Sequence, residues 1–252
     1  MTPPHLSLVV PCYDETHRLG PSIERILAWV RAQDFESEIV IVDDGSRDGT
    51  AEFAEQHLAD ARHVVLRHAR NRGKGAALRT GMLAAVGRHV LFSDADLSTP
   101  IEEASKFLAA HAAGAPIVIG SRKTKGAAVT KRQNPLRENM GRVYTWLSNV
   151  LICPGVSDFT CGFKSFVRQA AQDVFSRVRE EGWAYDSEVL YLARRLGYPV
   201  TEVPVAWAND PSTRVRLLRD AFGSAAGLAR IRGRALRGVY DAPGAAGEVV
   251  SA

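Results

Sequence analysis

The sequence predicts an α/β protein whose mostly parallel β-sheet is flanked by helices. The first observation is that short β-branched runs alternate with segments of helical periodicity over the first 120 residues. The second is a strand such as "EIVIV" (38–42), which is apolar at consecutive positions, as in parallel strands buried on both faces. The third is that polar residues cluster after several strands, where ligands bind in such sheets. The 252 residues suit one large domain of this class.

The strands are predicted from β-branched runs that end at proline or at turn residues. "LSLVVP" (6–11) is the first, and the others are 38–46, 63–68, 88–96, 116–122 and 199–207. The helices are predicted from apolar residues three and four positions apart. They span 22–33, 48–60, 74–86, 101–114, 136–152 and 183–197. Strand and helix alternate as far as residue 122, which predicts right-handed βαβ crossovers.

The later part of the chain has a weaker pattern. Residues 123–135 are basic and irregular, which predicts a loop. The helix at 136–152 has an apolar side made of Leu136, Met140, Val143, Leu147 and Val150. We expect the main domain to span 1–210, a basic helical segment to span 211–240, and 241–252 to form a disordered tail.

The composition is that of a soluble globular protein, with 46% apolar and 24% charged residues. A net charge of +4 is too mild to identify an anionic partner, and we expect no nucleic-acid partner. No stretch approaches the roughly 20 apolar residues of a membrane span, and the start does not resemble a signal peptide. The 3 scattered cysteines predict neither a disulfide framework nor a zinc site. We therefore expect a cytoplasmic protein.

Two acids, Asp94 and Asp96, end the strand in "LFSDADLSTP". Carboxylates this close repel each other unless a positive charge lies between them. A hard divalent cation such as Mg²⁺ or Mn²⁺ takes oxygen ligands and usually keeps substrate phosphates as further ligands. The alternative is a solvated turn that caps the next helix. The pair alone leaves both interpretations open.

Two more polar clusters follow other strands. "VDDGSRDGT" places Asp43 and Asp44 where an acid can accept hydrogen bonds from a ribose or a base, although a capped turn is the simpler explanation of this motif alone. "NRGKGAAL" places Lys74 between two glycines just before a helix, and a helix N-terminus with a lysine favours anions. This motif lacks the Walker spacing, and no G-x-G-x-x-G follows the first strand.

Together these motifs resemble the inverting family-two glycosyltransferases. The likeness continues through "VVPCYDE", "GSR", "SDFTCGFKSF", "GWAYDSEVLYLARRLGYPVTEVPVAW" and "STRV", and covers about residues 5–220. Within the family it is strongest to the polyprenyl-phosphate branch, the dolichyl-phosphate glucose and mannose synthases. The resemblance implies a GT-A fold with a Rossmann-like nucleotide-sugar domain, a nucleotide-sugar donor, and Mg²⁺ or Mn²⁺ as cofactor.

The resemblance also implies roles for individual residues. The nucleotide-sugar site would contain Pro11, Tyr13, Glu15, Asp43, Asp44, Lys74, Asp94 and Arg214. Arg122 and Arg137 match basic residues near the donor diphosphate and the acceptor phosphate. The metal would be bound by Asp94, Asp96 and Ser98. The mannose synthases often have glutamine where Ser98 stands and a serine where Gly141 stands, so these two positions depart from the branch.

The acceptor decides whether a general base is needed. A lipid phosphate is already an anion, whereas a hydroxyl acceptor needs a carboxylate to take its proton, and Asp158, Asp186 and Glu188 are the candidates. For Asp186 and Glu188 the alternative is an interaction with the N-terminus of a helix. We predict transfer of glucose from UDP-glucose, or next mannose from GDP-mannose, to a polyprenyl or dolichyl phosphate. The alternatives are a soluble hydroxyl acceptor with the same donor, and non-catalytic binding of a nucleotide sugar.

The segment 214–237 contains seven arginines and one acid, Asp220. One interpretation is a solvated helix. The other is a membrane-surface helix that brings the enzyme to a lipid acceptor, with an apolar side made of Leu217, Leu218, Phe222, Leu228 and Ile231. The second interpretation, which we favour, predicts a peripheral protein on the inner face of the membrane. The sequence leaves a homo-oligomer open.

Overall fold

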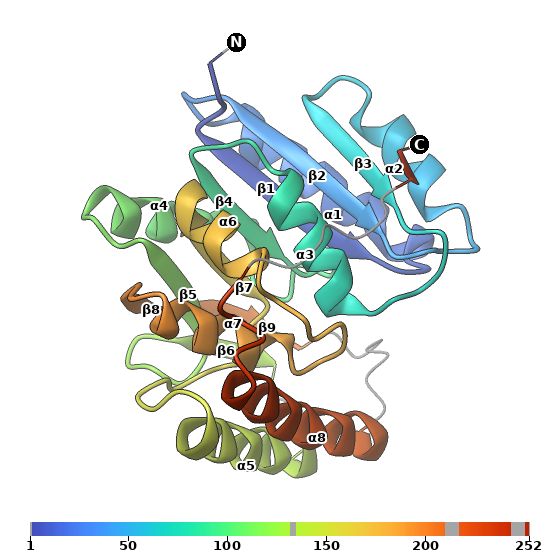
Figure 1. Cartoon of the computed structure of the whole chain (residues 1–252). Coiled ribbons are helices and arrows are strands. Elements are labelled where there is room, and N and C mark those ends of the chain that lie inside the picture. Colours follow the sequence, from blue (N-terminus) through green and yellow to red (C-terminus); the bar gives the residue numbers. More distant parts are fainter. Residues whose placement is uncertain (1, 132–134, 210–216, 243–249, 252) are drawn as a thin grey trace.

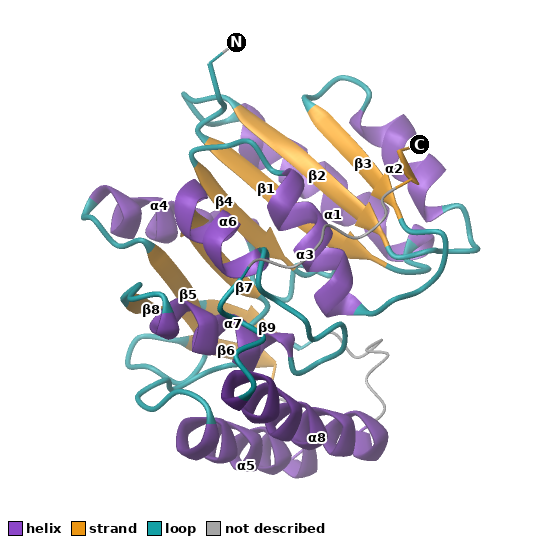
Figure 2. Ribbon diagram, in the orientation of Figure 1, coloured by secondary structure: helices purple, strands orange, loops and turns teal. Residues whose placement is uncertain are grey.

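An eight-stranded sheet lies between two layers of helices (Figures 1 and 2). The structure, a computed structural model, describes residues 2–131, 135–209, 217–242 and 250–251. The strands follow the order β10-β3-β2-β1-β4-β7-β5-β8. Their bounds are β1 Leu6–Cys12, β2 Ser37–Asp43, β3 His63–Arg67, β4 His89–Ser93, β5 Ile117–Ser121, β7 Phe163–Val167, β8 Val200–Pro204 and β10 Val250–Ser251. The predicted α/β class with a mostly parallel sheet is confirmed.

The two faces of the sheet bury alternate residues of each strand, as the period of two requires. Val9 and Val40 pack with α3 (Lys74–Ala84), α6 (Arg168–Phe175) and α7 (Tyr185–Arg195). Leu8 and Ile39 pack on the other face. The helices there are α1 Thr16–Arg31, α2 Thr50–Leu58 and α4 Ala104–Ala112, and the 3₁₀ turn η1 Ile101–Glu103 precedes α4. The core therefore consists of two apolar layers separated by the sheet.

The strand β7 runs antiparallel to both of its neighbours, β4 and β5. The sequence pattern did not place it, because an antiparallel insertion depends on a long-range pairing and not on a local signal. The helix α6 was also missed, since its 8 residues are too few to display a clear period. The strand β10 pairs with β3 at Arg67, which differs from the disordered tail expected at 241–252.

A second, two-stranded sheet lies near the carboxyl end of β5. It pairs β6 (Ala128–Lys131) with β9 (Ala206–Ala208) in parallel. The region of β6 was predicted to be a loop, and all four of its residues are exposed, so no alternation of apolar residues revealed it. This small sheet ties the segment before α5 to the strand end after β8.

The two long helices α5 (Pro135–Leu151) and α8 (Leu217–Leu236) pack side by side at the end of the molecule opposite to β3 (Figure 1). In α8, Leu228 and Ile231 are buried in the core, so they do not form an exposed apolar side as expected. The side chains of Leu217, Leu218 and Phe222 lie outside the described residues.

Two of the arginines of α8 are engaged with the protein. Arg230 and Arg234 form ion pairs with Glu180 at 2.7 and 2.5 Å, and the Glu180 side chain is 3% exposed. These contacts and the buried leucine and isoleucine attach α8 to the domain. Within the ranges that the structure describes, no helix has both the length and the apolar character to cross a membrane.

Candidate active site

Polar side chains converge at the carboxyl ends of the central strands. Asp43 is the last residue of β2, Asp94 follows β4, and Arg122 follows β5. Parallel strands end at the same edge of a sheet, so β1, β2, β4 and β5 present these groups to one region. Tyr13 and Glu15 follow β1 at the same edge.

Asp94 and Asp96 are carried by a tight turn. The Leu97 amide donates to the carbonyl of Asp94 at 3.1 Å, and Leu97 has a φ of 47°. This left-handed conformation costs a branched residue about 1–2 kcal/mol. Burial of the Leu97 side chain, which is 8% exposed, offsets that cost. The turn holds the two carboxylates just beyond the end of the strand.

Lys74 lies against Asp94, with Nζ and Oδ1 2.5 Å apart. Its ammonium group also lies over the rings of Trp183 and Tyr185, at 5.5 and 5.9 Å from their centroids. Burial opposes the charged lysine, but the carboxylates of Asp94 and Asp186 outweigh it and raise the pKa of Lys74. Lys74 is therefore a fixed cation at this edge of the sheet.

The acidic pair fits a divalent cation. Burial and the nearby charge of Asp94 raise the pKa of Asp96, so Lys74 does not fully compensate the two carboxylates. The Ser98 amide donates to Asp96 Oδ1 at 2.9 Å, and its hydroxyl also bonds to Asp96. Within the described ranges, no cluster of three or more His, Cys, Asp or Glu residues could hold a metal. Two carboxylates plus substrate phosphates are a usual ligand set for Mg²⁺.

Gly162 makes room for Asp94. A Cβ placed on Gly162 would lie 2.2 Å from Asp94 Oδ2, which is far inside van der Waals contact. The turn before β7 therefore touches the carboxylate that follows β4. No sequence motif marks Gly162, since nothing in "TCGFKSF" reveals which side chain its backbone approaches.

Asp186 is buried and paired with Lys164. The Lys164 side chain is 0% exposed, and its Nζ lies 2.5 Å from Asp186 Oδ1. The same ammonium group donates to the carbonyls of Phe159 and Cys161 at 3.0 and 2.7 Å. Burial raises the pKa of Asp186 despite this partner. Lys164 thus connects the predicted base to the backbone of the loop before β7, a role that no sequence motif indicated.

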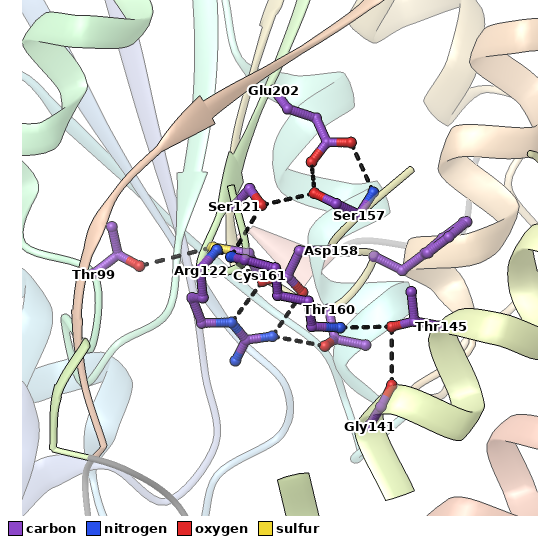
Figure 3. Close-up of polar contacts among 12 residues, drawn as sticks. Thr99, Ser121, Arg122, Gly141, Thr145, Ser157, Asp158, Thr160, Cys161 and Glu202 are labelled. Carbon is purple, nitrogen blue, oxygen red and sulfur yellow. Dashed lines mark hydrogen bonds and ion pairs between the residues drawn. The ribbon is translucent and has the colours of Figure 1, made fainter. Parts of the chain in front are cut away.

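Arg122 and Asp158 form a bidentate pair (Figure 3). The two N–O distances are 2.7 and 2.8 Å, and the Arg122 amide also donates to Asp158 at 3.0 Å. Burial opposes the ionised carboxyl, but Arg122 outweighs it and lowers the pKa of Asp158 to about 2. Both carboxylate oxygens are occupied, which leaves this group poorly suited to take a proton from an acceptor.

The guanidinium group of Arg122 has further contacts. It donates to the Thr160 hydroxyl at 2.8 Å and lies 5.2 Å from the centre of the Trp207 ring. The Arg122 side chain is 18% exposed, so it keeps some access to solvent. The bidentate pair with Asp158 fixes the plane of the guanidinium group, and the Trp207 ring packs near it. The arginine is therefore held in one orientation.

The residues on either side of Arg122 make polar contacts with two other parts of the protein (Figure 3). The Ser121 hydroxyl lies 2.9 Å from that of Ser157, which in turn bonds to Glu202. Lys123 donates from Nζ to the Thr145 hydroxyl at 2.8 Å. The loop after β5 is therefore connected to the loop before β7 and to the helix α5.

Asp43 is fully buried at the end of β2. Its Oδ1 accepts from the Ser46 amide at 3.0 Å. Its Oδ2 has no hydrogen bond among the described residues, although Arg67 Nε approaches it to 3.3 Å in an unfavourable direction. This ion pair lacks hydrogen-bond geometry, so the buried oxygen keeps the capacity to accept from a ligand N–H.

Asp44, which follows β2, uses both of its carboxylate oxygens within the protein. Its two oxygens accept from the amides of Arg72 and Gly73 at 3.0 and 2.7 Å. The His68 ring nitrogen Nδ1 lies 2.7 Å from Asp44 Oδ1, and its Nε2 lies 2.9 Å from the Thr80 hydroxyl. Asp44 thus anchors the loop before α3, and no sequence motif marks its partner His68.

The glycines of "NRGKG" accommodate another part of the protein. A Cβ on Gly73 or Gly75 would lie 2.4 Å from the Glu181 carbonyl oxygen or 2.2 Å from that of Glu180. The amides of Gly75 and Ala76 donate to the Glu181 carbonyl at 2.7 and 3.3 Å. We expected the glycines and the helix N-terminus to approach an anion, but in the structure they receive the loop at 180–182.

The remaining predicted residues are placed as follows. Glu15 forms a salt bridge with Arg18 at 2.5 Å, and its amide donates to the Thr50 hydroxyl at 2.9 Å. Pro11 lies in β1. Arg214 and the side chain of Arg137 lie outside the described residues. Glu188 is buried, accepts from the amides of Arg179 and Glu180, and bonds to Tyr240, so it supports the attachment of α8.

Residues 7–175 match the family described as Glycosyl transferase family 2. The chain belongs to this family. A dolichyl-phosphate beta-glucosyltransferase of Dictyostelium discoideum is 30% identical over 94% of this chain and 76% of its own length. One of Drosophila melanogaster is 35% identical over 83% of this chain and 69% of its own length. The chain is therefore a glycosyltransferase, and the family resemblance read from its motifs is confirmed.

Solved structures of other proteins share the fold of this chain and support the GT-A architecture. A mannosyl-3-phosphoglycerate synthase from Rubrobacter xylanophilus superposes with a TM-score of 0.67 at 20% identity, over 93% of this chain and 74% of that one. A glucosyl-3-phosphoglycerate synthase from Mycobacterium tuberculosis, solved with Mn²⁺, UDP-glucose and phosphoglyceric acid, gives 0.68 at 19% identity, over 91% and 80%. At this identity the likeness shows the fold alone. The predicted GT-A fold is confirmed.

Proposed function

We propose that this glycosyltransferase moves glucose from UDP-glucose to a dolichyl or other polyprenyl phosphate, with inversion at the sugar C1. The observation that carries the proposal is the edge of the sheet where Asp94, Asp96 and Lys74 face the strand end that holds Arg122. The names of the curated relatives, at 30% and 35% identity over most of the chain, support glucose and the lipid phosphate. Mannose from GDP-mannose is the next donor.

The nucleotide would lie over the ends of β1 and β2. The buried Asp43 oxygen that lacks a hydrogen bond would accept from a base N–H. Asp44 would act indirectly, because both of its oxygens are used to hold the loop that carries Lys74. Pro11, Tyr13 and Glu15 would line the same side of the nucleotide, with Arg214 contributing to the diphosphate site.

The donor diphosphate would lie at the ends of β4 and α3. Asp94 and Asp96, with Ser98 beside them, would bind Mg²⁺ or Mn²⁺, which supplies positive charge to the leaving diphosphate. Lys74 adds a second positive charge near the same oxygens. Electrostatic stabilisation of this kind is commonly the largest contribution to such a transfer.

In the transfer, an oxygen of the acceptor phosphate attacks the sugar C1 from the face opposite to the diphosphate. The bond from C1 to the diphosphate oxygen breaks, and its electron pair stays on the departing nucleotide. No proton has to be removed from an anionic phosphate, so no general base is required. Arg122 and Arg137 would bind the acceptor phosphate, and Asp158 would hold Arg122 in the orientation seen in the structure.

The test is a panel of nucleotide sugars incubated with the full chain, Mg²⁺ or Mn²⁺, and a short water-soluble polyprenyl phosphate. We expect mass spectrometry to detect a hexosyl phosphate product with UDP-glucose as the best donor. A second arm offers phosphoglyceric acid or another hydroxyl acceptor. Product from the hydroxyl acceptor alone would overturn the lipid-phosphate proposal, and no product from any donor would overturn the donor assignment.

A further inference from the structure

A cavity lies beside α3, against the segment that joins α6 to α7 (Figure 1). Its volume is about 200 Å³, which gives room for several water-sized groups. Three arginines and two acids contribute to its lining, namely Arg72, Arg79, Arg179, Glu180 and Glu181. Of the residues that the structure describes, none of those predicted for the donor or the metal lines it. The cavity is therefore a polar hollow that the proposed transfer does not use.

The cavity and the proposed donor site lie on different sides of α3. Arg79 lines the cavity, whereas Gly81 lies against the sheet, where an added Cβ would be 2.5 Å from Val9. Two residues of an α-helix that are two positions apart point in directions that differ by about 200°. Lys74, at the start of the helix, extends to Asp94 at the edge of the sheet. An anion in the cavity would therefore not touch the pair formed by Lys74 and Asp94.

Both acids of the lining are already engaged with arginines. Glu181 pairs with Arg72 at 2.9 Å. Glu180 pairs with Arg230 and Arg234 of α8, which do not line the cavity, at 2.7 and 2.5 Å. The negative charge of Glu180 is therefore compensated from the side of α8, and Glu181 compensates one arginine of the lining. The lining keeps an excess of positive charge.

The other two arginines of the lining are oriented by backbone carbonyls. Arg79 donates from Nε to the carbonyl of Phe175 at 3.2 Å, and Arg179 donates from Nη1 to two nearby carbonyls at 3.0 Å each. A carbonyl orients a guanidinium group but does not neutralise its charge. Burial, and then the nearby charges of Arg179 and Arg72, lower the pKa of Arg79. Glu181 acts in the opposite direction but does not cancel them. An anion in the cavity would relieve this repulsion.

The walls of the cavity are connected to the loop that carries Lys74. The carbonyl of Glu181 accepts from the first amides of α3, as described above. On the other wall, the Thr80 hydroxyl lies 2.9 Å from Nε2 of His68. His68 in turn contacts Asp44, the carboxylate that holds the loop before α3. An anion bound between these walls would restrain the start of α3 and hence the position of Lys74.

We propose that this cavity is a second anion site, which binds a phosphate or diphosphate group between Arg72, Arg79 and Arg179. Guanidinium groups match the oxygens of a phosphate with two parallel hydrogen bonds, and three of them around one hollow suit a doubly charged anion. The side chain of Arg72 is 28% exposed, so the site is open to an anion from solvent. The inference does not depend on the proposed function, because the cavity needs neither donor nor acceptor to bind an anion.

The experiment measures binding of inorganic phosphate and of pyrophosphate to the full chain by titration calorimetry, without divalent cations. The wild type should bind both anions, and its melting temperature should rise with their concentration. Arg79→Gln should weaken binding about tenfold or more, because a hydrogen bond between charged groups is lost. Glu181→Gln, at a side chain that is 55% exposed, should strengthen binding severalfold, because it removes an acid from the lining.

The matched control is Arg31→Gln, at an exposed position in the last turn of α1, on the other face of the sheet. It should bind both anions like the wild type, and so should Lys74→Gln, which removes the cation of the proposed donor site. Circular dichroism melting checks that each variant is folded. The proposal is overturned if the wild type binds neither anion, or if Lys74→Gln loses the binding that Arg79→Gln keeps. Weaker or unchanged binding by Glu181→Gln also overturns it.

A competition arm identifies the source of the phosphate. UDP is added to Lys74→Gln that already holds pyrophosphate. Displacement would assign the cavity to the phosphates of a nucleotide, whereas persistence of the pyrophosphate would assign it to a free phosphate anion. Both results support the site, provided that Arg79→Gln has lost the binding.

Discussion

The Nζ of Lys74 lies 2.5 Å from Oδ1 of Asp94, although the two residues belong to different βα units. Lys74 begins α3 and Asp94 follows β4, and the order of strands in the sheet brings them together. The pair fixes one carboxylate of the D-x-D motif and leaves Asp96 with a raised pKa. The diphosphate end of the proposed site is therefore built around one lysine and two acids.

Replacing Asp96 by asparagine should remove the metal-dependent activity. The amide keeps the size of the side chain but removes the negative charge that a divalent cation needs. We expect kcat to fall about 100-fold or more, and titration calorimetry to show weaker Mn²⁺ binding in the presence of UDP. Asp60→Asn, at an exposed position near the end of α2, should leave both measurements unaltered. Normal Mn²⁺ binding by Asp96→Asn would exclude the metal role.

Replacing Gly162 by alanine should displace the carboxylate of Asp94. The new Cβ would come within 2.2 Å of a side-chain oxygen, and a flexible carboxylate yields more readily than the backbone. We expect a loss of activity of about tenfold to 100-fold with little change in melting temperature. Gly223→Ala, where no atom lies within 4 Å of the added group, is the matched control. Full activity of Gly162→Ala would mean that the position of Asp94 is unimportant.

The sequence was sufficient for the fold class and for the strand ends at which the candidate residues lie. The strand "EIVIV" and the acids that follow β2 and β4 are local signals, because burial on both faces and a polar strand end are each visible in a few letters. The parallel strands and the convergence of Asp43, Asp94 and Arg122 follow from them. The antiparallel β7 and the exposed β6 depend on distant partners, so periodicity could not reveal them.

The partners of the site residues were the part that sequence could not supply. Lys164 and Asp186 are 22 positions apart, and Arg122 and Asp158 are 36 apart. Nothing local shows that an acid is already neutralised by a buried lysine or by a bidentate arginine. The same limit applies to α5, where helical spacing identified an apolar side but not whether that side meets the core.

The Arg122–Asp158 pair should contribute stability that depends on pH. Because the pKa of Asp158 is about 2 in the folded protein and near 3.8 when unfolded, folding favours the ionised form. This contribution, about 2–3 kcal/mol, is complete above the unfolded pKa and is lost as the pH falls from about 5 to about 2. Asp158→Asn should therefore destabilise the protein at pH 7 by about 3 kcal/mol, by leaving Arg122 unpaired.

The measurement is urea unfolding of the wild type and Asp158→Asn between pH 7 and pH 3. The stability difference between them should shrink toward low pH, whereas Asp34→Asn, at an exposed position, should behave like the wild type at every pH. A difference that is constant with pH would show that the pair does not depend on the charge of Asp158. The activity of the wild type should show no loss near pH 6 that depends on Asp158, since this carboxyl is already ionised there.

The role of Asp186 distinguishes a phosphate acceptor from a hydroxyl acceptor. If the acceptor is a phosphate, Asp186 serves to neutralise the buried Lys164, and Asp186→Asn should reduce kcat by less than about tenfold. If Asp186 is a general base, the same change should reduce kcat by about 10²–10⁴-fold.

Both single variants, Asp186→Asn and Lys164→Met, should lose stability, because each leaves its partner buried without a counter-charge. The double variant Lys164→Met/Asp186→Leu removes both charges and should recover much of that stability. The measurement is kcat with a polyprenyl phosphate for these three variants, which separates the electrostatic role of the pair from proton transfer. A loss of more than 100-fold that is confined to the two variants without Asp186 would favour Asp186 as a general base.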